Sequence, residues 1–280
     1  FADAAIFIEG SAERILLPHF VSSEFKYLNQ CYVTWLEIGG SHAHRLQPLI
    51  ERLGILTLII TDIDACDPAD HRRASRPILG KGLRTNNTTI RKWLPKKDKI
   101  DELLTLSEKD KVVLSGPLFA VRVAYQIPIN VERKGKNHLV TPYTFEDAIV
   151  LENIAAITKL KGSGLLGKFS ALASADSDAE GFADSLFDAI DDKKKTEFAL
   201  DLLELKTEPT ALRCPGYIAE ALAWLEMRLK NNKAEVLAPV LNTAEVLHDA
   251  LINVTDTAKD QPISATEGNL PAADGIGESE

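Results

Sequence analysis

Two short apolar segments, each followed by acidic residues, constrain the fold most strongly. Ala4–Ile8 and Ile55–Thr61 are largely apolar and rich in isoleucine, which is typical of strands covered on both faces of a parallel sheet. Tyr32–Ile38 is a third, less uniform candidate strand. Between them, Ser11–Leu28 and Ser41–Leu53 carry apolar residues at helical spacing. The order predicts an α/β fold that begins β-α-β-α-β, a right-handed doubly wound arrangement.

The later segments change in character along the chain. After Asp64 a long polar and basic stretch is followed by Thr85-Asn86-Asn87-Thr88, which predicts a loop leading into a short capped helix. A further strand is expected in Val123–Val131. From Phe145 onward the spacing is helical. The helices are expected at Phe145–Leu160, Ala179–Ile190, Thr196–Leu205 and Tyr217–Lys230.

These patterns predict three parts of the chain. Residues 1–143 would form the α/β domain, with a basic loop and helix segment at 70–105. Residues 144–240 would form a helical domain that completes the site. Residues 241–280 would hold the end of a helix and an acidic tail, expected to be disordered because it is rich in Pro, Gly, Ser and Ala.

The net charge of −9 argues against a nucleic-acid partner if it is taken as a single sum. From Asp256 onward, however, six acids stand against Lys259, so this tail alone contributes −5. Between Arg72 and Lys99, ten Lys or Arg residues stand against the single acid Asp98. That segment would give a basic surface if it folds as a unit. A solvated loop is the alternative, and both remain open at this point.

Several classes of protein are disfavoured by simple features. No segment approaches the ~20 apolar residues that a membrane-spanning helix needs. Cys31, Cys66 and Cys214 are far apart without metal-ligand spacing, as expected for free thiols in a reducing cytoplasm. The chain begins at Phe1 directly within a buried-strand pattern, so we expect it to be part of a longer protein.

Acidic residues follow two of the predicted strands. Glu9 ends the first strand and Glu13 lies four residues later on the same helical face, with Gly10 allowing a tight turn. Asp62 and Asp64 end the strand that follows. In doubly wound sheets ligands gather beyond the carboxyl ends of strands. Four carboxylates there would repel one another, and a divalent cation would keep them ionised.

Each acidic pair also has an alternative interpretation. Glu13 alone would be a helix N-terminal charge favoured by the macrodipole. An apolar strand followed by Asp-x-Asp is also how haloacid-dehalogenase-type phosphatases place their nucleophile, here Asp62, and their acid. That class needs no glutamate on an earlier strand, and it would want Thr or Val where Cys66 stands.

A strand ending in Glu followed by a later strand ending in Asp-x-Asp resembles Toprim domains. More specifically, the sequence resembles the nuclease region of OLD (overcoming lysogenisation defect) proteins over most of residues 1–230. The motifs that carry this resemblance are Glu9-Gly10-Ser11-Ala12-Glu13, Ile38-Gly39-Gly40, Thr61-Asp62-Ile63-Asp64, Thr85-Asn86-Asn87, Trp93-Leu94-Pro95, Thr144-Phe145-Glu146-Asp147-Ala148, Lys195-Thr196-Glu197-Phe198-Ala199 and Pro215-Gly216-Tyr217-Ile218-Ala219-Glu220.

The resemblance implies a Toprim fold with an additional helical domain and a site for two Mg²⁺ or Mn²⁺ ions ~4 Å apart. Glu146 would add a ligand to the four Toprim acids, with Asp147 as an adjacent candidate. For Asp147, helix capping is a nearly equal alternative. Lys195 would stabilise charge on the scissile phosphate, although it also lies in an ordinary run of solvated charges.

The implied activity is hydrolysis of phosphodiester bonds in duplex DNA. Basic residues would hold the flanking phosphates, with candidates at Arg72, Arg73, Arg84, Lys92 and Lys168. Family members also carry an N-terminal ABC-type ATPase region, and no Walker A motif is found in this sequence. A non-catalytic DNA-binding module with a structural cation is the third possibility.

Three further motifs are interpreted as structural. Gly162-x-Gly164-x-x-Gly167-Lys168 matches a dinucleotide fingerprint by letter but follows a helical pattern, so a flexible loop is expected. His42 and His44, two residues apart, are expected to be surface or capping residues. Ser115-Gly116-Pro117 is expected to be a turn.

Overall fold

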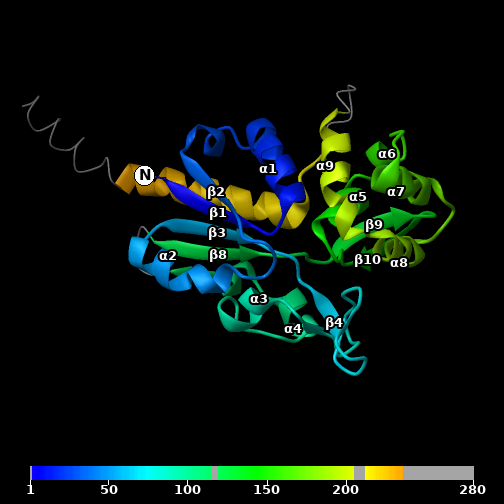
Figure 1. Cartoon of the computed structure of the whole chain (residues 1–280), viewed down its shortest axis with the longest axis horizontal. Coiled ribbons are helices and arrows are strands. Elements are labelled where there is room, and N and C mark those ends of the chain that lie inside the picture. The colour runs from blue at the N-terminus through cyan, green and yellow to red at the C-terminus, as the bar shows by residue number, and fades with distance from the viewer. Residues whose placement is uncertain (1, 115–118, 205–211, 236–280) are drawn as a thin grey trace, which may run out of the picture. The chain divides into compact units, whose positions relative to one another are not determined.

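A five-stranded sheet forms the centre of the fold, in the order β2-β1-β3-β8-β7 (Figure 1). The first four strands are parallel to one another and β7 runs antiparallel to β8. The computed structural model describes residues 2–114, 119–204 and 212–235, and the chain up to Asn232 forms one compact unit. The strands are β1 (Ala4–Ile8), β2 (Val33–Glu37), β3 (Leu56–Ile60), β7 (Val112–Leu114) and β8 (Ala120–Ala124).

The predicted β-α-β-α-β start is confirmed. Every residue of β1 and β3 is buried, because helices cover both faces of the sheet. Ile6 and Ile8 pack in one core cluster with α1 (Ser11–Glu24), whereas Phe7 packs in a second cluster with α2 (Gln47–Leu53). This alternation follows from the two-residue period of a strand.

Both helices are shorter than the sequence predicts. α1 ends at Glu24, and a separate 3₁₀ turn, η1, covers Leu28–Gln30. The segment expected to be helical from Ser41 starts as the 3₁₀ turn η2 (Ala43–Leu46), and α2 begins only at Gln47. Pro48 lies in the first turn of α2, where its missing N–H costs no helical hydrogen bond.

The basic segment after β3 is folded. It contains a small sheet in the order β5-β4-β6 and two short helices. Ile90, Trp93 and Ile100 are buried against the second core cluster, so the solvated-loop alternative is wrong. The elements are β4 (Ala65–Asp67), β5 (Arg73–Ala74), β6 (Arg84–Thr85), α3 (Thr88–Lys92), α4 (Ile100–Thr105) and η3 (Glu108–Lys111).

The strand predicted at Val123–Val131 is wrong, because the structure has two strands there. β8 ends at Ala124, and β9 (Ile129–Arg133) forms a separate antiparallel hairpin with β10 (Lys136–Val140). Pro128 has no N–H to donate to a sheet ladder. The apolar pattern on either side of the break hid it in the sequence.

Beyond the hairpin the chain is helical, and Figure 1 shows the helices up to residue 204 beyond the carboxyl ends of β1 and β3. The expected helix Phe145–Leu160 is broken at Asn153. The side-chain amide of Asn153 donates to Ile149 O (2.8 Å) and accepts from Arg213 N (2.8 Å). The elements are α5 (Phe145–Glu152), α6 (Ile154–Ile157), α7 (Gly164–Ser174), α8 (Ala179–Ala189), η4 (Asp192–Lys194) and α9 (Lys195–Glu204), followed by a helix over 216–235.

Two other expectations from the sequence have different outcomes. The loop expected over Gly162–Lys168 is wrong from Gly164 onward, where α7 begins and buries Leu165 and Leu166. The turn expected at 115–117 and the tail over 241–280 lie outside the described residues. Cys31, Cys66 and Cys214 form no disulfide bond within the described residues. None of the helices in the described parts of the chain is long and apolar enough to cross a membrane.

Candidate functional site

Four acidic side chains lie at the carboxyl ends of β1 and β3. Glu9 follows β1 directly, and Glu13 occupies the first turn of α1, whose N-cap is the extended Gly10. Asp62 and Asp64 follow β3, which pairs with β1 in parallel. Glu13 is 7% and Asp62 9% exposed. The sheet pairing therefore brings the four predicted carboxylates to one edge, as expected.

The backbone at Asp64 departs from ordinary strand geometry. Its φ of 49° lies in the left-handed region, which non-glycine residues rarely adopt. Asp64 O accepts a hydrogen bond from Asn86 N (2.8 Å), which holds the turn against the segment that follows β6. Such strained residues concentrate at functional sites.

The pKa values of all four carboxyl groups are raised, in each case first by burial. Burial, followed by repulsion from Asp64, raises the pKa of Glu9 to about 8. Burial and then Glu146 raise the pKa of Glu13 to about 7. Burial and then Glu9 raise the pKa of Asp62 well above its usual range, and burial raises that of Asp64 to about 6. A counter-charge would be needed to keep all of these groups ionised at neutral pH.

Glu146 and Lys195 join this cluster from the helical part of the chain. Lys195 Nζ lies 3.3 Å from Glu146 Oε2 and 3.2 Å from Asp192 Oδ1. Glu146 is 1% exposed. The pKa of Lys195 is raised because the attraction of Glu146, Asp62 and Asp192 outweighs the effect of burial. Both side chains thus lie close to the carboxylates that follow β1 and β3.

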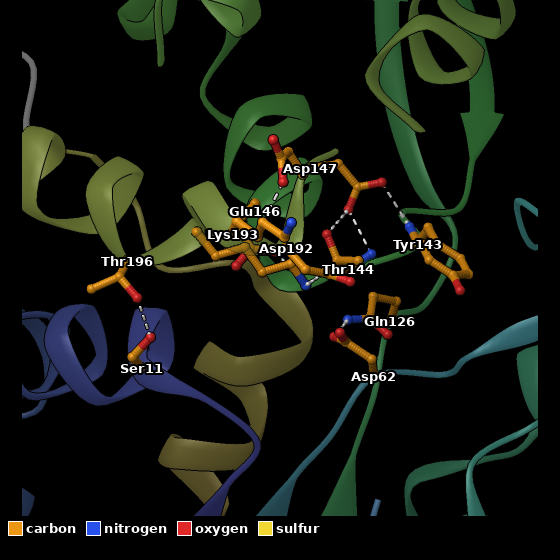
Figure 2. A network of polar contacts seen from close by, with 12 residues as sticks. Ser11, Asp62, Gln126, Tyr143, Thr144, Glu146, Asp147, Asp192, Lys193 and Thr196 are labelled. Atoms are coloured by element: carbon orange, nitrogen blue, oxygen red, sulfur yellow. Dashed lines mark hydrogen bonds and ion pairs between the residues drawn. The ribbon is translucent and has the colours of Figure 1, made fainter. Parts of the chain in front are cut away.

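A contact between two helix starts holds Lys195 toward the sheet. The hydroxyl groups of Ser11, the first residue of α1, and Thr196, in the first turn of α9, are 2.5 Å apart (Figure 2). Glu13 lies two positions after Ser11, and Lys195 directly precedes Thr196. This contact brings the start of α9, where Lys195 lies, beside the start of α1, where Glu13 lies.

Asp147 has the geometry of a helix cap. Its two carboxylate oxygens accept hydrogen bonds from Tyr143 N (2.8 Å) and Thr144 N (2.7 Å), and Thr144 completes a capping box (Figure 2). Burial raises its pKa to about 6 despite these donors. Of the two alternatives for Asp147, capping is the one that its contacts describe.

Gln126 is a site residue that the sequence did not reveal. It is fully buried, and its Nε2 donates to Asp62 Oδ1 (2.6 Å) and to the Tyr217 hydroxyl (3.2 Å). Its Oε1 accepts from Ile63 N (2.7 Å). The only available signal was one amide between Tyr125 and Ile127 in an apolar stretch. Gln126 orients the Asp62 carboxylate from the break after β8.

Asn87 links the basic segment to the carboxylate cluster through side-chain hydrogen bonds. Its Oδ1 caps α3 by accepting from Ile90 N (3.0 Å), as predicted from the sequence. Its Nδ2 donates to Thr61 Oγ1 (2.6 Å), Asp62 O (2.8 Å) and Glu9 Oε1 (3.3 Å). The Thr61 hydroxyl in turn donates to Glu9 Oε1. The cap residue therefore also orients Glu9, which the sequence pattern did not predict.

The predicted DNA-binding residues differ in their surroundings. Arg72 is exposed, and its guanidinium donates to Asn86 Oδ1 (2.7 Å) and Thr85 O (2.9 Å). Arg73 lies 3.9 Å from Asp70, and Arg84 forms an ion pair with Asp98. Lys92 on α3 and Lys168 on α7 are exposed.

One basic residue of the same segment does not contribute to a basic surface. Arg76 is 6% exposed and forms ion pairs with Glu180 and Asp184 of α8. Its charge is therefore used to attach the segment to α8. The basic surface predicted over residues 72–99 is smaller than the count of charges suggests.

The donor set suits a hard divalent cation. Within residues 2–114, 119–204 and 212–235, no three His, Cys, Asp or Glu side chains are already arranged to hold one metal ion. The cluster nevertheless offers buried carboxylate oxygens with raised pKa values, the ligands that Mg²⁺ and Mn²⁺ prefer. Glu146 Oε2 is buried, and its contact is the Lys195 ammonium at 3.3 Å, which does not have hydrogen-bond geometry. The carboxylate cluster therefore fits the divalent cation that a Toprim fold implies.

The chain is similar in sequence to one family model and to one characterised protein. Residues 1–64 match the family model "Overcoming lysogenization defect protein-like, TOPRIM domain". The chain is 26% identical over 245 residues to Endonuclease GajA of Bacillus cereus (strain HuB5-5), covering 83% of this chain and 32% of that protein. The chain thus spans about a third of the length of this curated relative.

Two solved structures are also similar. The C-terminal region of the Burkholderia pseudomallei OLD protein aligns at 20% identity with a TM-score of 0.44, over 82% of this chain and 99% of that one. The C-terminal region of the Xanthomonas campestris pv. campestris OLD protein aligns at 18% identity with a TM-score of 0.45, over 84% and 97%. Over residues 1–64, this chain is thus similar to the Toprim domain of overcoming-lysogenisation-defect-like proteins.

Proposed function

We propose that this chain is the catalytic part of a divalent-metal-dependent endonuclease that hydrolyses phosphodiester bonds of duplex DNA. The observation that carries the proposal is the convergence of Glu9, Glu13 and Asp62 with Glu146 and Lys195, which come from a distant part of the chain. The family match and the similarity to a protein named as an endonuclease support the same activity.

Two ions, Mg²⁺ or Mn²⁺, would be held by carboxylates from both parts of the chain. The proposed ligands are Glu9, Glu13, Asp62, Asp64 and Glu146. Once bound, the ions would supply Lewis-acid stabilisation of phosphate charge and lower the pKa of a water molecule. Asp147 is a further and weaker candidate ligand, because both of its oxygens serve the helix cap.

The chain's own residues would orient these ligands and stabilise phosphate charge. Gln126 holds Asp62 through a 2.6 Å hydrogen bond, and Asn87 holds Glu9 and the backbone of Asp62. Lys195, kept protonated by Glu146 and Asp192, would place its ammonium beside the charge that builds on the scissile phosphate. In this proposal residues 144–240 complete a site that residues 1–143 begin.

The surrounding surface and the longer protein complete the proposal. Arg72 and Lys92 would hold phosphates nearest the carboxylates, with Arg73, Arg84 and Lys168 farther along the substrate. Because this chain spans 32% of its curated relative, an ABC-type ATPase region is proposed in the full-length protein, as the resemblance implies.

The test is incubation of the purified chain with supercoiled plasmid in Mg²⁺, Mn²⁺, Ca²⁺ or EDTA. Nicked and linear products in Mg²⁺ or Mn²⁺ are expected, and they should be absent in EDTA and in Glu9→Gln. Glu51→Gln, an exposed acid on α2, is the matched control and should retain activity. Intact plasmid in every metal would contradict the proposal.

The phosphatase alternative makes a different prediction in the same preparation. A phosphatase with Asp62 as nucleophile would turn over a small phosphomonoester and survive Glu9→Gln. A non-catalytic module would bind DNA and leave it intact. The Toprim family match favours neither the phosphatase nor the non-catalytic module.

A further inference from the structure

The segment after β2 docks on α3 through three hydrogen bonds. Thr89 Oγ1 donates to Ser41 O (2.9 Å), His44 N donates to Thr89 Oγ1 (3.2 Å), and Thr88 N donates to Ser41 Oγ (3.1 Å). These contacts join two segments that are far apart in the sequence. They fix η2, the 3₁₀ turn that carries His44 and Arg45, beside the short helix that carries Lys92.

This docking gathers positive charge on one surface. The pKa of His44 is lowered by burial and then, against a hydrogen bond to Ser41 O, by the nearby Lys92, Arg45 and His42. His42, Arg45 and Lys92 are exposed, and the His42 and His44 ring centroids lie 6.3 Å apart. No ion pair joins Arg45 or Lys92 to an acid among the described residues. We call His42, His44, Arg45 and Lys92 the η2–α3 surface.

The η2–α3 surface is attached to the carboxylate cluster at both of its segments. Gly40 N, just before η2, donates to Glu9 O (3.3 Å). Asn87, the cap of α3, donates to Glu9 Oε1 and to Asp62 O. The surface therefore lies at the same carboxyl edge of the sheet as the proposed metal ligands.

We propose that the η2–α3 surface binds the phosphodiester backbone of duplex DNA next to the bond that is cut. The proposal rests on the proposed function and deepens it, because it assigns one side of the substrate path. Guanidinium, ammonium and imidazole donors suit phosphate oxygens, and within the described residues Arg45 and Lys92 have no ion-pair partner that would compete. The contacts would position the duplex without reading its sequence. In this proposal His42, His44 and Arg45 contact the DNA backbone. The sequence suggested only surface or capping roles for the two histidines.

The fold supplies a matched control in Arg52. It is also exposed, but it lies in the last turn of α2, just before Gly54 leads the chain into β3. Because α2 returns the chain from the carboxyl edge to the amino edge of the sheet, Arg52 lies at the opposite edge from Arg45. Removing either arginine changes the net charge equally, so a difference between the variants reports position rather than total charge.

The experiment measures binding of a fluorescent duplex DNA by anisotropy across a salt series in EDTA. Arg45→Ala is compared with Arg52→Ala, which loses the same charge, and the double variant Arg45→Ala/Lys92→Ala is compared with wild type. The double variant should bind at least about tenfold more weakly, and its salt slope should fall by about two, roughly 0.9 for each phosphate that is no longer neutralised. Arg52→Ala should retain wild-type affinity and slope. Circular dichroism confirms folding, and the single variants serve if the double variant misfolds.

Each outcome bears separately on the two proposals. Equal affinity and slope for the double variant and Arg52→Ala would overturn the η2–α3 assignment even if plasmid is cleaved. Weakened binding confined to the double variant would support it even if no plasmid is cleaved, in which case only the nuclease proposal fails. A wild-type preference for duplex RNA over duplex DNA would overturn the choice of partner.

Discussion

Lys195 Nζ lies 3.3 Å from Glu146 Oε2, and this ion pair links the start of α9 to the start of α5. Glu146 is almost completely buried, whereas the Lys195 side chain is 22% exposed. Lys195 is thus a single ammonium beside a group of carboxylates whose pKa values are raised by burial and mutual repulsion. One lysine cannot neutralise them all, which is why cations from solution are expected there.

The first prediction concerns Lys195. Lys195→Ala should lower the plasmid cleavage rate by roughly 10²–10³-fold, the range found when a preorganised donor is removed. Lys195→Arg should recover part of that activity because it keeps the positive charge. Lys193→Ala is the matched control, since Lys193 is an exposed lysine of the same charge run. Equal activity of Lys195→Ala and Lys193→Ala would refute the assigned role.

The second prediction concerns Asn87. Asn87→Ala removes the cap of α3 and the donors to Glu9, Thr61 and the Asp62 carbonyl. The free energy of unfolding should fall by about 1–3 kcal/mol, as for a buried polar group left without its partner. Mn²⁺ affinity should fall as well. Urea unfolding and calorimetric Mn²⁺ titration measure the two effects.

Asn86→Ala provides the comparison for Asn87. The Asn86 side chain is exposed and hydrogen-bonds Arg72 rather than a carboxylate. It should unfold at a denaturant concentration close to that of wild type and bind Mn²⁺ normally. Similar Mn²⁺ affinities for the two variants would show that Asn87 has no role in orienting Glu9.

The third prediction concerns Gln126. Gln126→Leu leaves Asp62 Oδ1, Ile63 N and the Tyr217 hydroxyl without this partner. Cleavage should fall about tenfold or more, as expected when a metal ligand is no longer supported by its hydrogen-bond partner. Tyr217→Phe removes only the 3.2 Å hydrogen bond and should have a smaller effect. A larger decrease of cleavage in Tyr217→Phe than in Gln126→Leu would contradict this order.

The fourth prediction concerns pH. The pKa of Glu9 rises from 4.5 to about 8 and that of Glu13 from 4.5 to about 7, first through burial. At pH values between 4.5 and the raised pKa values, the folded, metal-free chain holds more protons on Glu9 and Glu13 than the unfolded chain does. Their contribution to stability is therefore present at acidic pH and is lost as pH rises through about 7 to 8.

Thermal unfolding in EDTA and in Mn²⁺ tests this sign. In EDTA the Tm of wild type should fall relative to the Tm of Glu9→Gln/Glu13→Gln as pH rises from about 5 to 8. The stabilisation of wild type by Mn²⁺ should grow over the same range, because protons compete with the metal for the same oxygens. A Tm difference independent of pH would mean that neither glutamate titrates in this range.

The sequence by itself determined the features that depend on local pattern. The strands around Ala4–Ile8 and Leu56–Ile60 were predictable because buried parallel strands leave continuous apolar runs. The positions of Glu9, Glu13, Asp62 and Asp64 followed, since parallel neighbours end at one edge of a sheet. Glu146 and Lys195 were reached only through the resemblance to a known family, because nothing in their local pattern distinguishes them from ordinary helix starts.

Only the tertiary structure decided which polar groups meet. Asn87 and Glu9 are 78 residues apart, and Gln126 and Asp62 are 64 apart, so no local period connects them. The capping geometry of Asp147 depends on backbone N–H groups whose directions the sequence does not show. The η2–α3 surface likewise exists because three hydrogen bonds dock distant segments. The spacing of apolar residues along the chain determines where helices and strands form. The packing of these helices and strands in space then determines which polar groups form hydrogen bonds with one another.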